Sequence, residues 1–143
     1  MTDGDLYRLI YVSRSRIPLD DPDAFEDEVG AIMSSARRRN PTIRVSGALL
    51  VTDRGFAQYL EGPRSAVAEL YEAISLDGRH SDLVVLDFSP IEKRVFPVWG
   101  MGRIRPAADP RLDLDDGQIG AGATGDAIEA LVAAMKAHVE AGR

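Results

Sequence analysis

The sequence contains no cysteine, which excludes disulfide bonds, thiolate catalysis, cysteine-ligated zinc and iron–sulfur clusters. It has only two histidines, His80 and His138, so a metal site with several histidine ligands is not expected. The net charge of −6 argues against the phosphate contacts on which nucleic-acid binding depends. No hydrophobic run approaches the roughly 18 residues that span a bilayer, and the N-terminus is acidic where a signal peptide would be basic. We therefore expect a cytoplasmic protein that binds no metal, nucleic acid or membrane.

A chain of 143 residues with 45% hydrophobic residues suits one globular domain with a real core. Residues 106–143 hold seven acidic and three basic side chains, so this tail carries −4 of the net −6. Its first part lacks periodicity and is rich in proline, glycine and aspartate, which is typical of a linker. Its second part shows a helical apolar stripe after a capping-box spacing at Asp126 and Glu129. We predict a domain over 1–105, a linker over 106–123 and a C-terminal amphipathic helix over 124–143.

The order of the remaining segments predicts the fold class. Strands are expected over 6–12, 45–52, 56–61, 83–88 and 95–104, the last at an edge or with a bulge because Pro97 interrupts it. One helix should open at Asp21-Pro22 and end at Asn40-Pro41, and a second should run from Gly62-Pro63 to about Asp77-Gly78. This βαββαβ order with an extra strand predicts a ferredoxin-like α+β fold. Its five-stranded mixed sheet would carry two helices on one face, plus the C-terminal helix.

Two polar side chains fall on strand faces that alternation assigns to the core. Gln58 shares a face with Phe56 and Leu60, and Tyr11 shares one with Leu9. Burying an unpartnered amide costs about 1–3 kcal/mol, so both groups need hydrogen-bond partners. The simpler interpretations are an amide bonded to backbone at the rim and a core tyrosine with its hydroxyl at the surface. If the two strands are neighbours, the side chains could instead meet each other or a ligand.

Other candidates also have two interpretations. Ile32 and Ile74 lie on the inner stripes of the two helices, where they could be plain core or could hold a flat ring between them. Arg79 and His80 follow the second helix. They could form a solvated turn, or they could donate hydrogen bonds to a heterocycle with a phosphate tail. Trp99 and Met101 alternate with glycines. They could be plain packing residues, or they could belong to a segment that can repack. The basic run 37–39 suits the negative end of its helix better than it suits nucleic acid.

Six segments, in this order along residues 5–105, resemble the BLUF domains, which are blue-light sensors that use flavin. They are Leu6-Tyr-Arg-Leu-Ile-Tyr11-Val-Ser13, Arg39-Asn40-Pro41, Val45-Ser-Gly-Ala-Leu-Leu50, Phe56-Ala-Gln58-Tyr-Leu-Glu-Gly62, Asp77-Gly-Arg79-His80 and Arg94-Val-Phe-Pro-Val-Trp99-Gly-Met101. The LOV domains, another class of flavin photosensor, need a cysteine and are excluded.

The resemblance implies a flavin ring held between the two helices, with FAD expected and FMN or riboflavin able to fit the same ring site. Tyr11 and Gln58 match the photoactive pair, and Trp99 and Met101 match the strand that reports the signal. The residues that match cofactor contacts are Ile32, Arg39, Asn40, Gln58, Ile74, Asp77, Arg79 and His80. Two positions depart from the family pattern: Arg39 replaces a usual Asn or His, and Ala36 replaces a serine near Gln58. Both could change the rate of dark recovery.

The resemblance therefore implies a blue-light photoreceptor and not an enzyme. An excited flavin would take an electron and then a proton from Tyr11, after which the Gln58 amide would rotate or tautomerise. The strand with Trp99 and Met101 and the C-terminal helix would relay this change to an unidentified effector protein. That helix should bury its stripe on the open face of the sheet, which we favour over a homodimer, higher homo-oligomer or effector interface.

Two alternative functions remain open. One is a small acylphosphatase-type hydrolase, although no glycine-rich anion cradle accompanies Arg14 or Asn40. The other is a cofactor-free ferredoxin-like interaction module. Colour separates them, since only a flavin photosensor should be yellow.

Overall fold

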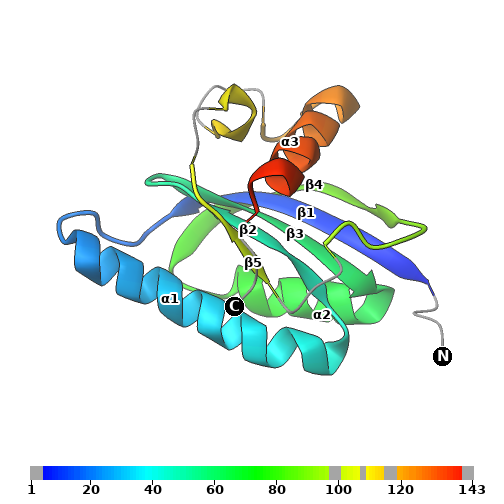
Figure 1. The fold of residues 1–143 in the computed structure, drawn as a ribbon, viewed down its shortest axis with the longest axis horizontal. Coiled ribbons are helices and arrows are strands. Elements are labelled where there is room, and N and C mark those ends of the chain that lie inside the picture. The colour runs from blue at the N-terminus through cyan, green and yellow to red at the C-terminus, as the bar shows by residue number, and fades with distance from the viewer. Residues whose placement is uncertain (1–4, 97–100, 107–108, 115–118, 140–143) are drawn as a thin grey trace.

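The computed structural model describes residues 5–96, 101–106, 109–114 and 119–139 (Figure 1). The strands are β1 (Leu6–Ser15), β2 (Ser46–Val51), β3 (Gly55–Pro63), β4 (His80–Pro90) and β5 (Gly102–Ile104). The helices are α1 (Pro22–Arg39), α2 (Arg64–Ser75) and α3 (Gly125–His138), with short 3-10 helices at Asn40–Ile43 and Pro110–Leu112. Among these helices none is long and apolar enough to cross a lipid bilayer.

The strands form one mixed sheet in the order β4-β1-β3-β2-β5. β1 runs antiparallel to both β3 and β4, β2 runs antiparallel to β3, and β5 adds to the edge of β2 in parallel. This topology confirms the predicted ferredoxin-like α+β fold with its extra strand. The register places Tyr11 directly opposite Gln58, so the two side chains share one face at adjacent positions.

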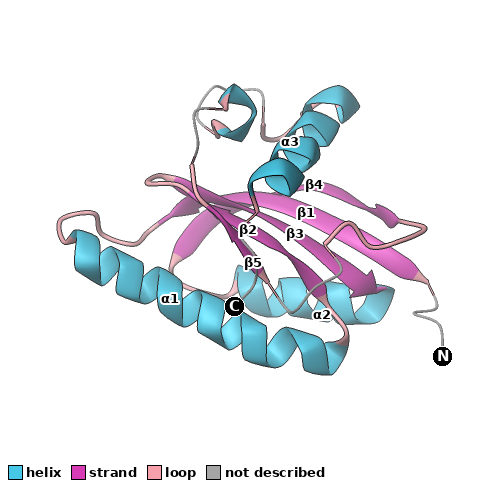
Figure 2. Ribbon diagram, viewed as in Figure 1, coloured by secondary structure: helices cyan, strands magenta, loops and turns pink. Residues whose placement is uncertain are grey.

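The sheet is covered on both faces (Figure 2). α1 and α2 lie on one face, over a core that includes Leu9, Val29, Leu60 and Val67. α3 lies on the other, where Leu131 and Met135 pack with residues of the central strands such as Ile10, Leu50 and Tyr59. The docking of the C-terminal helix on the sheet is therefore confirmed.

The helix ends follow the sequence in one case and depart from it in another. Asp21 caps α1 as predicted, because its carboxylate accepts hydrogen bonds from the N–H groups of Asp23 and Ala24. The predicted capping box of α3 is wrong. Thr124 caps this helix by accepting from the N–H of Ala127 at 3.1 Å. Glu129 is not part of the cap because it pairs with Arg8 of β1, at 3.2 and 2.8 Å.

The last predicted strand, over 95–104, is too long. β5 covers only Gly102–Ile104, and Pro97 lies outside the described residues. Val95 and Phe96 are not in a strand, because their backbone N–H groups donate to the carboxylate of Glu61 at 2.8 and 2.7 Å. The prediction of an edge position for this strand is confirmed.

Candidate functional site

The Tyr11 hydroxyl donates a hydrogen bond of 2.5 Å to Gln58 Oε1. Both residues are buried, with 3% and 5% of their surface exposed. The other end of the amide, Nε2, lies 3.6 Å from the Met101 sulfur, and Met101 is fully buried. Tyr11 and Gln58 therefore meet each other, which is the second of the two interpretations given above, because β1 and β3 are neighbours.

Aromatic rings surround the Tyr11 phenol. Tyr71 of α2 lies 5.7 Å away between ring centroids, and His80 lies 5.9 Å away in an edge-on arrangement. Burial raises the pKa of the Tyr11 hydroxyl far above its ordinary value, and Tyr71 and Asp77 raise it further. The hydroxyl is therefore a hydrogen-bond donor across the physiological pH range.

His80 is held from both sides of its ring. Its Nε2 lies 2.8 Å from the backbone oxygen of Ile74, which can only accept, so Nε2 carries a proton. Its Nδ1 lies 2.8 Å from the Ser13 hydroxyl, which donates to this nitrogen when the ring is neutral. The neutral Nε2–H tautomer thus satisfies both contacts and fixes the ring beside Tyr11.

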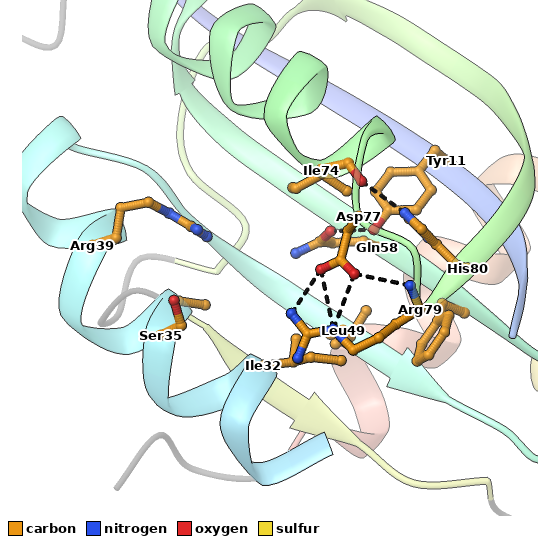
Figure 3. A pocket seen from close by; sticks show the side chains of 12 residues that line it. Tyr11, Ile32, Ser35, Arg39, Leu49, Gln58, Ile74, Asp77, Arg79 and His80 are labelled. Carbon is orange, nitrogen blue, oxygen red and sulfur yellow. Dashed lines mark hydrogen bonds and ion pairs between the residues drawn. The ribbon is translucent and has the colours of Figure 1, made fainter. Parts of the chain in front are cut away.

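These groups border a cavity between α1 and α2 (Figure 3). Ile32 of α1 and Ile74 of α2 reach into it from opposite sides, with Gln58 and Tyr11 deeper toward the sheet. The complete lining is Tyr11, Ile32, Ser35, Ala36, Arg39, Leu49, Phe56, Gln58, Ile74, Asp77, Arg79 and His80. The cavity has a volume of about 80 Å³.

An ion pair lies across the cavity, between the two isoleucines in the view of Figure 3. The Arg79 guanidinium bonds to the Asp77 carboxylate at 2.7 Å, and Glu28 of α1 lies 3.6 Å from Arg79. The hydrogen bond from Arg79 lowers the pKa of Asp77, which keeps this carboxylate ionised at neutral pH. The Arg79 side chain remains 36% exposed, so the ion pair lies at the solvent-facing border of the cavity.

Arg39 and Asn40 lie where α1 ends. Arg39 Nε donates to Asn40 Oδ1 at 3.0 Å, and Asn40 is fully buried. Partial burial lowers the pKa of the Arg39 guanidinium, which borders the cavity although the residue is largely exposed. Asn40 does not itself line the cavity but holds the arginine that does.

The structure thus brings seven predicted contact residues to the cavity, together with Tyr11, and places Asn40 and Met101 directly behind them. Trp99 lies outside the described residues. Ala36 lines the cavity near Gln58, as predicted, without a hydroxyl to offer. The roles of all these residues toward a cofactor remain predictions. Within the described part of the chain, no group of three acidic or histidine side chains could hold a metal ion.

The sequence alone did not point to Ser13, Arg37 or Leu49. Ser13 could have been found from the two-residue period of β1, which places it on the same face as Tyr11. Leu49 faces Gln58 across β2 and β3, which needs the strand register. Arg37 was interpreted through the helix dipole alone, yet its Nε donates to the backbone oxygen of Met101 at 3.1 Å.

A family model described as BLUF, sensors of blue-light using FAD, matches residues 6–102. The photoactivated adenylate cyclase subunit beta of Euglena longa is 38% identical over 95 residues, which cover 66% of this chain and 10% of that protein. The blue light- and temperature-regulated antirepressor BluF of Escherichia coli (strain K12) is 39% identical over 90 residues, covering 62% of this chain and 21% of the antirepressor. The chain thus spans about a tenth of the length of the cyclase relatives.

Among solved structures, the dark state of the BLUF protein BlrB superposes with a TM-score of 0.75 at 34% identity. The match covers 95% of this chain and 98% of that one. It extends the likeness from the six sequence segments to almost the whole molecule and confirms the resemblance. The chain belongs to the BLUF family of blue-light sensors that use flavin.

Proposed function

We propose that this chain holds a flavin ring between α1 and α2 and that blue light changes the hydrogen bonds of Tyr11 and Gln58. The observation that supports this most strongly is the buried 2.5 Å bond from the Tyr11 hydroxyl to Gln58 Oε1 at the edge of the cavity. A buried phenol and a buried carboxamide that meet in this way form the pair that the photochemistry needs.

The lining residues suit a flat heterocycle with polar edges. Ile32 and Ile74 supply aliphatic walls from the two helices. The Gln58 amide nitrogen has two N–H bonds, and its described side-chain partner is a thioether, which is a weak acceptor. Since buried amides ordinarily find strong partners, this nitrogen is suited to donate to a ring carbonyl.

The polar border supplies contacts for the ring edge and for the rest of the cofactor. We assign these contacts to Asp77, Arg79 and His80 on one side and to Arg39, supported by Asn40, on the other. A three-ring group needs more than 80 Å³, so part of the border must move aside, and the solvent-exposed parts of the Arg39 and Arg79 side chains can do so. We propose FAD as the cofactor. FMN and riboflavin carry the same ring and could use the same walls, because contacts to the ring do not distinguish the tails of the three flavins.

A bound flavin supplies blue-light absorption and, when excited, a strong oxidant. Tyr11 would be the electron donor to such a ring. Its hydroxyl proton already lies against Gln58 Oε1, so the amide oxygen is the nearest acceptor for that proton. Loss of the hydrogen bond from Tyr11 would free the amide to rotate, and a proton gained at Oε1 with another lost from Nε2 would tautomerise it. Once the electron and the proton had returned to Tyr11, the lasting change would be the new set of hydrogen bonds at Gln58.

The signal should then travel through Met101, which contacts Gln58 directly, and through α3 to a partner protein. An effector contact, and not an enzymatic activity of this chain, is the proposed output, as in an antirepressor, which acts through another protein. The partner is unidentified, and a homodimer or higher homo-oligomer is one form the contact could take.

Absorption spectra before and after blue light test this proposal. The wild type should be yellow and should show a red shift that reverses in the dark, whereas Tyr11→Phe and Gln58→Leu should bind flavin without that shift. Tyr59→Phe is the matched control, since it removes a buried phenol from the neighbouring position of β3 on the opposite face. Colourless protein that takes up no added flavin would favour the interaction module or the hydrolase, and a normal shift in Tyr11→Phe would refute the role of the pair.

A further inference from the structure

Met101 is held at two points that lie on different elements. Its sulfur faces Gln58 Nε2 of β3 at 3.6 Å, and its backbone oxygen accepts a hydrogen bond from Arg37 Nε of α1 at 3.1 Å. The residue is fully buried and immediately precedes β5, whose first residue, Gly102, pairs with Ala48 of β2. A rearrangement of the Gln58 amide therefore changes its contact with Met101, a residue whose backbone is hydrogen-bonded to α1.

The same helix holds the rest of β5. Glu26, near the start of α1, pairs with Arg103 and Arg105, each at 3.0 Å. Arg103 is well covered, with a side chain 12% exposed. α1 is thus joined to the segment 101–105, which contains β5, by Glu26 near the first turn of the helix and by Arg37 in its last turn.

A thioether by itself cannot fix this geometry. The methionine side chain has three rotatable bonds, and sulfur is a weak acceptor, so the bond from Gln58 does little to hold it. The bond from a charged guanidinium to the Met101 carbonyl is the stronger of the two contacts. The backbone contact therefore fixes where the side chain starts, and the packed core around Met101 limits where its sulfur can lie.

We propose that Arg37 is a positioning residue for the photoreaction: by holding the Met101 carbonyl it keeps the thioether against Gln58 and supports the dark arrangement of the amide. This inference rests on the proposed function and names a residue that acts on Gln58 only through Met101. Without Arg37, the amide returns to an arrangement that has lost part of its support, so dark recovery is slower.

Arg37→Gln in the flavin-loaded full chain tests this inference, with the exposed neighbour Arg38→Gln as the matched control. We expect recovery after a blue flash to slow about tenfold in Arg37→Gln and to stay within twofold of wild type in Arg38→Gln. Peroxide oxidation of Met101, followed by peptide mass spectrometry in the dark and without flavin, should accelerate by a similar factor. Wild-type rates for both readouts in Arg37→Gln would overturn the inference.

A double-mutant cycle with Met101→Leu separates positioning from a general loss of structure. Leucine removes the sulfur, so Arg37→Gln should change recovery far less in the Met101→Leu background than in the wild type. Additive effects would show that Arg37 acts elsewhere and would overturn the inference. If Arg37→Gln does not fold, Arg37→Lys replaces it in the same cycle. A wild type without any light-induced shift would refute the proposed function itself, whereas a normal wild-type photocycle with unaffected Arg37 variants refutes this inference alone.

Discussion

Tyr11 and Tyr59 lie on opposite faces of the sheet, and their burial sets how the protein responds to alkaline pH. They are 3% and 0% exposed, and burial raises the pKa of each hydroxyl well above its ordinary value. The nearby Glu61 carboxylate raises the pKa of Tyr59 further, and the charge of Arg8 opposes this effect. In the unfolded chain both hydroxyls ionise near pH 10.

Proton linkage determines whether the free energy of unfolding rises or falls with pH. Above pH 10 the unfolded chain loses two protons that the folded chain keeps, so the free energy of unfolding falls as the pH rises. Each tyrosine contributes about 1.4 kcal/mol per pH unit once the pH is well above 10, or about 2.7 kcal/mol per unit for the pair. Below pH 9 both states are protonated, and these residues give no pH dependence.

Guanidinium unfolding followed by circular dichroism between pH 8 and 11.5 measures this slope. Tyr11→Phe and Tyr59→Phe should each remove about half of it, and the double variant should remove almost all of the tyrosine contribution. Because the chain has four tyrosines, the absorbance titration of the folded protein is compared with that of the variants. An absorbance change near pH 10 that is lost in Tyr11→Phe or Tyr59→Phe, or a double variant with the wild-type slope, would refute the reasoning. At pH 7 the single variants should differ. Tyr11→Phe leaves Gln58 Oε1 without its donor and costs about 1–3 kcal/mol, whereas Tyr59→Phe removes a hydroxyl with no hydrogen-bond partner in the described structure and is close to neutral.

Three further substitutions test the framework around the site. Gly47→Ala would place a Cβ 1.9 Å from a carbonyl oxygen of β3, so we expect no soluble folded protein, whereas Gly30→Ala, with open space around it, should fold normally. Glu61→Gln keeps only one acceptor oxygen for the two N–H groups of 95–96, so thermal unfolding should show a loss of about 1–3 kcal/mol. The bond from Arg8 lowers the pKa of Glu129, so stability gained above about pH 4 is lost as the pH falls. Because Glu129 is largely exposed, Glu129→Gln should remove less than about 1 kcal/mol, and acid unfolding that is unchanged in this variant would contradict the pairing.

Local periodicity was sufficient to find the main parts of the site. Alternation along two strands placed Tyr11 and Gln58 on inward faces, and the helical stripes placed Ile32 and Ile74. The fold class followed from element order alone, because short connections leave few ways to arrange a βαββαβ chain. These features depend on residues that are close in sequence or on a topology with few alternatives.

The parts that sequence missed depend on contacts between distant segments. The bond from Ser13 to His80 joins residues 67 positions apart, and Arg37 meets Met101 across 64 positions. The residues at 95–96 are apolar, as in a buried strand. Their backbone N–H groups, however, donate to the buried Glu61 carboxylate and not to the backbone of a neighbouring strand. Such partners are set by packing of the whole sheet, which no local pattern records.

The position of α3 also decides how its part in signalling can be tested. Removing the helix by ending the chain near residue 105 would uncover the fully buried Ile10, Leu50 and Tyr59 on the second face of the sheet. An exposed apolar face of this kind favours aggregation, so altered recovery in such a truncation would not identify a relay. Glu129→Gln weakens the tie between α3 and β1 while leaving the apolar contacts in place. If the signal passes through α3, this variant changes dark recovery or partner binding; if it passes through Met101 to α1, it leaves both unchanged while Arg37→Gln alters recovery.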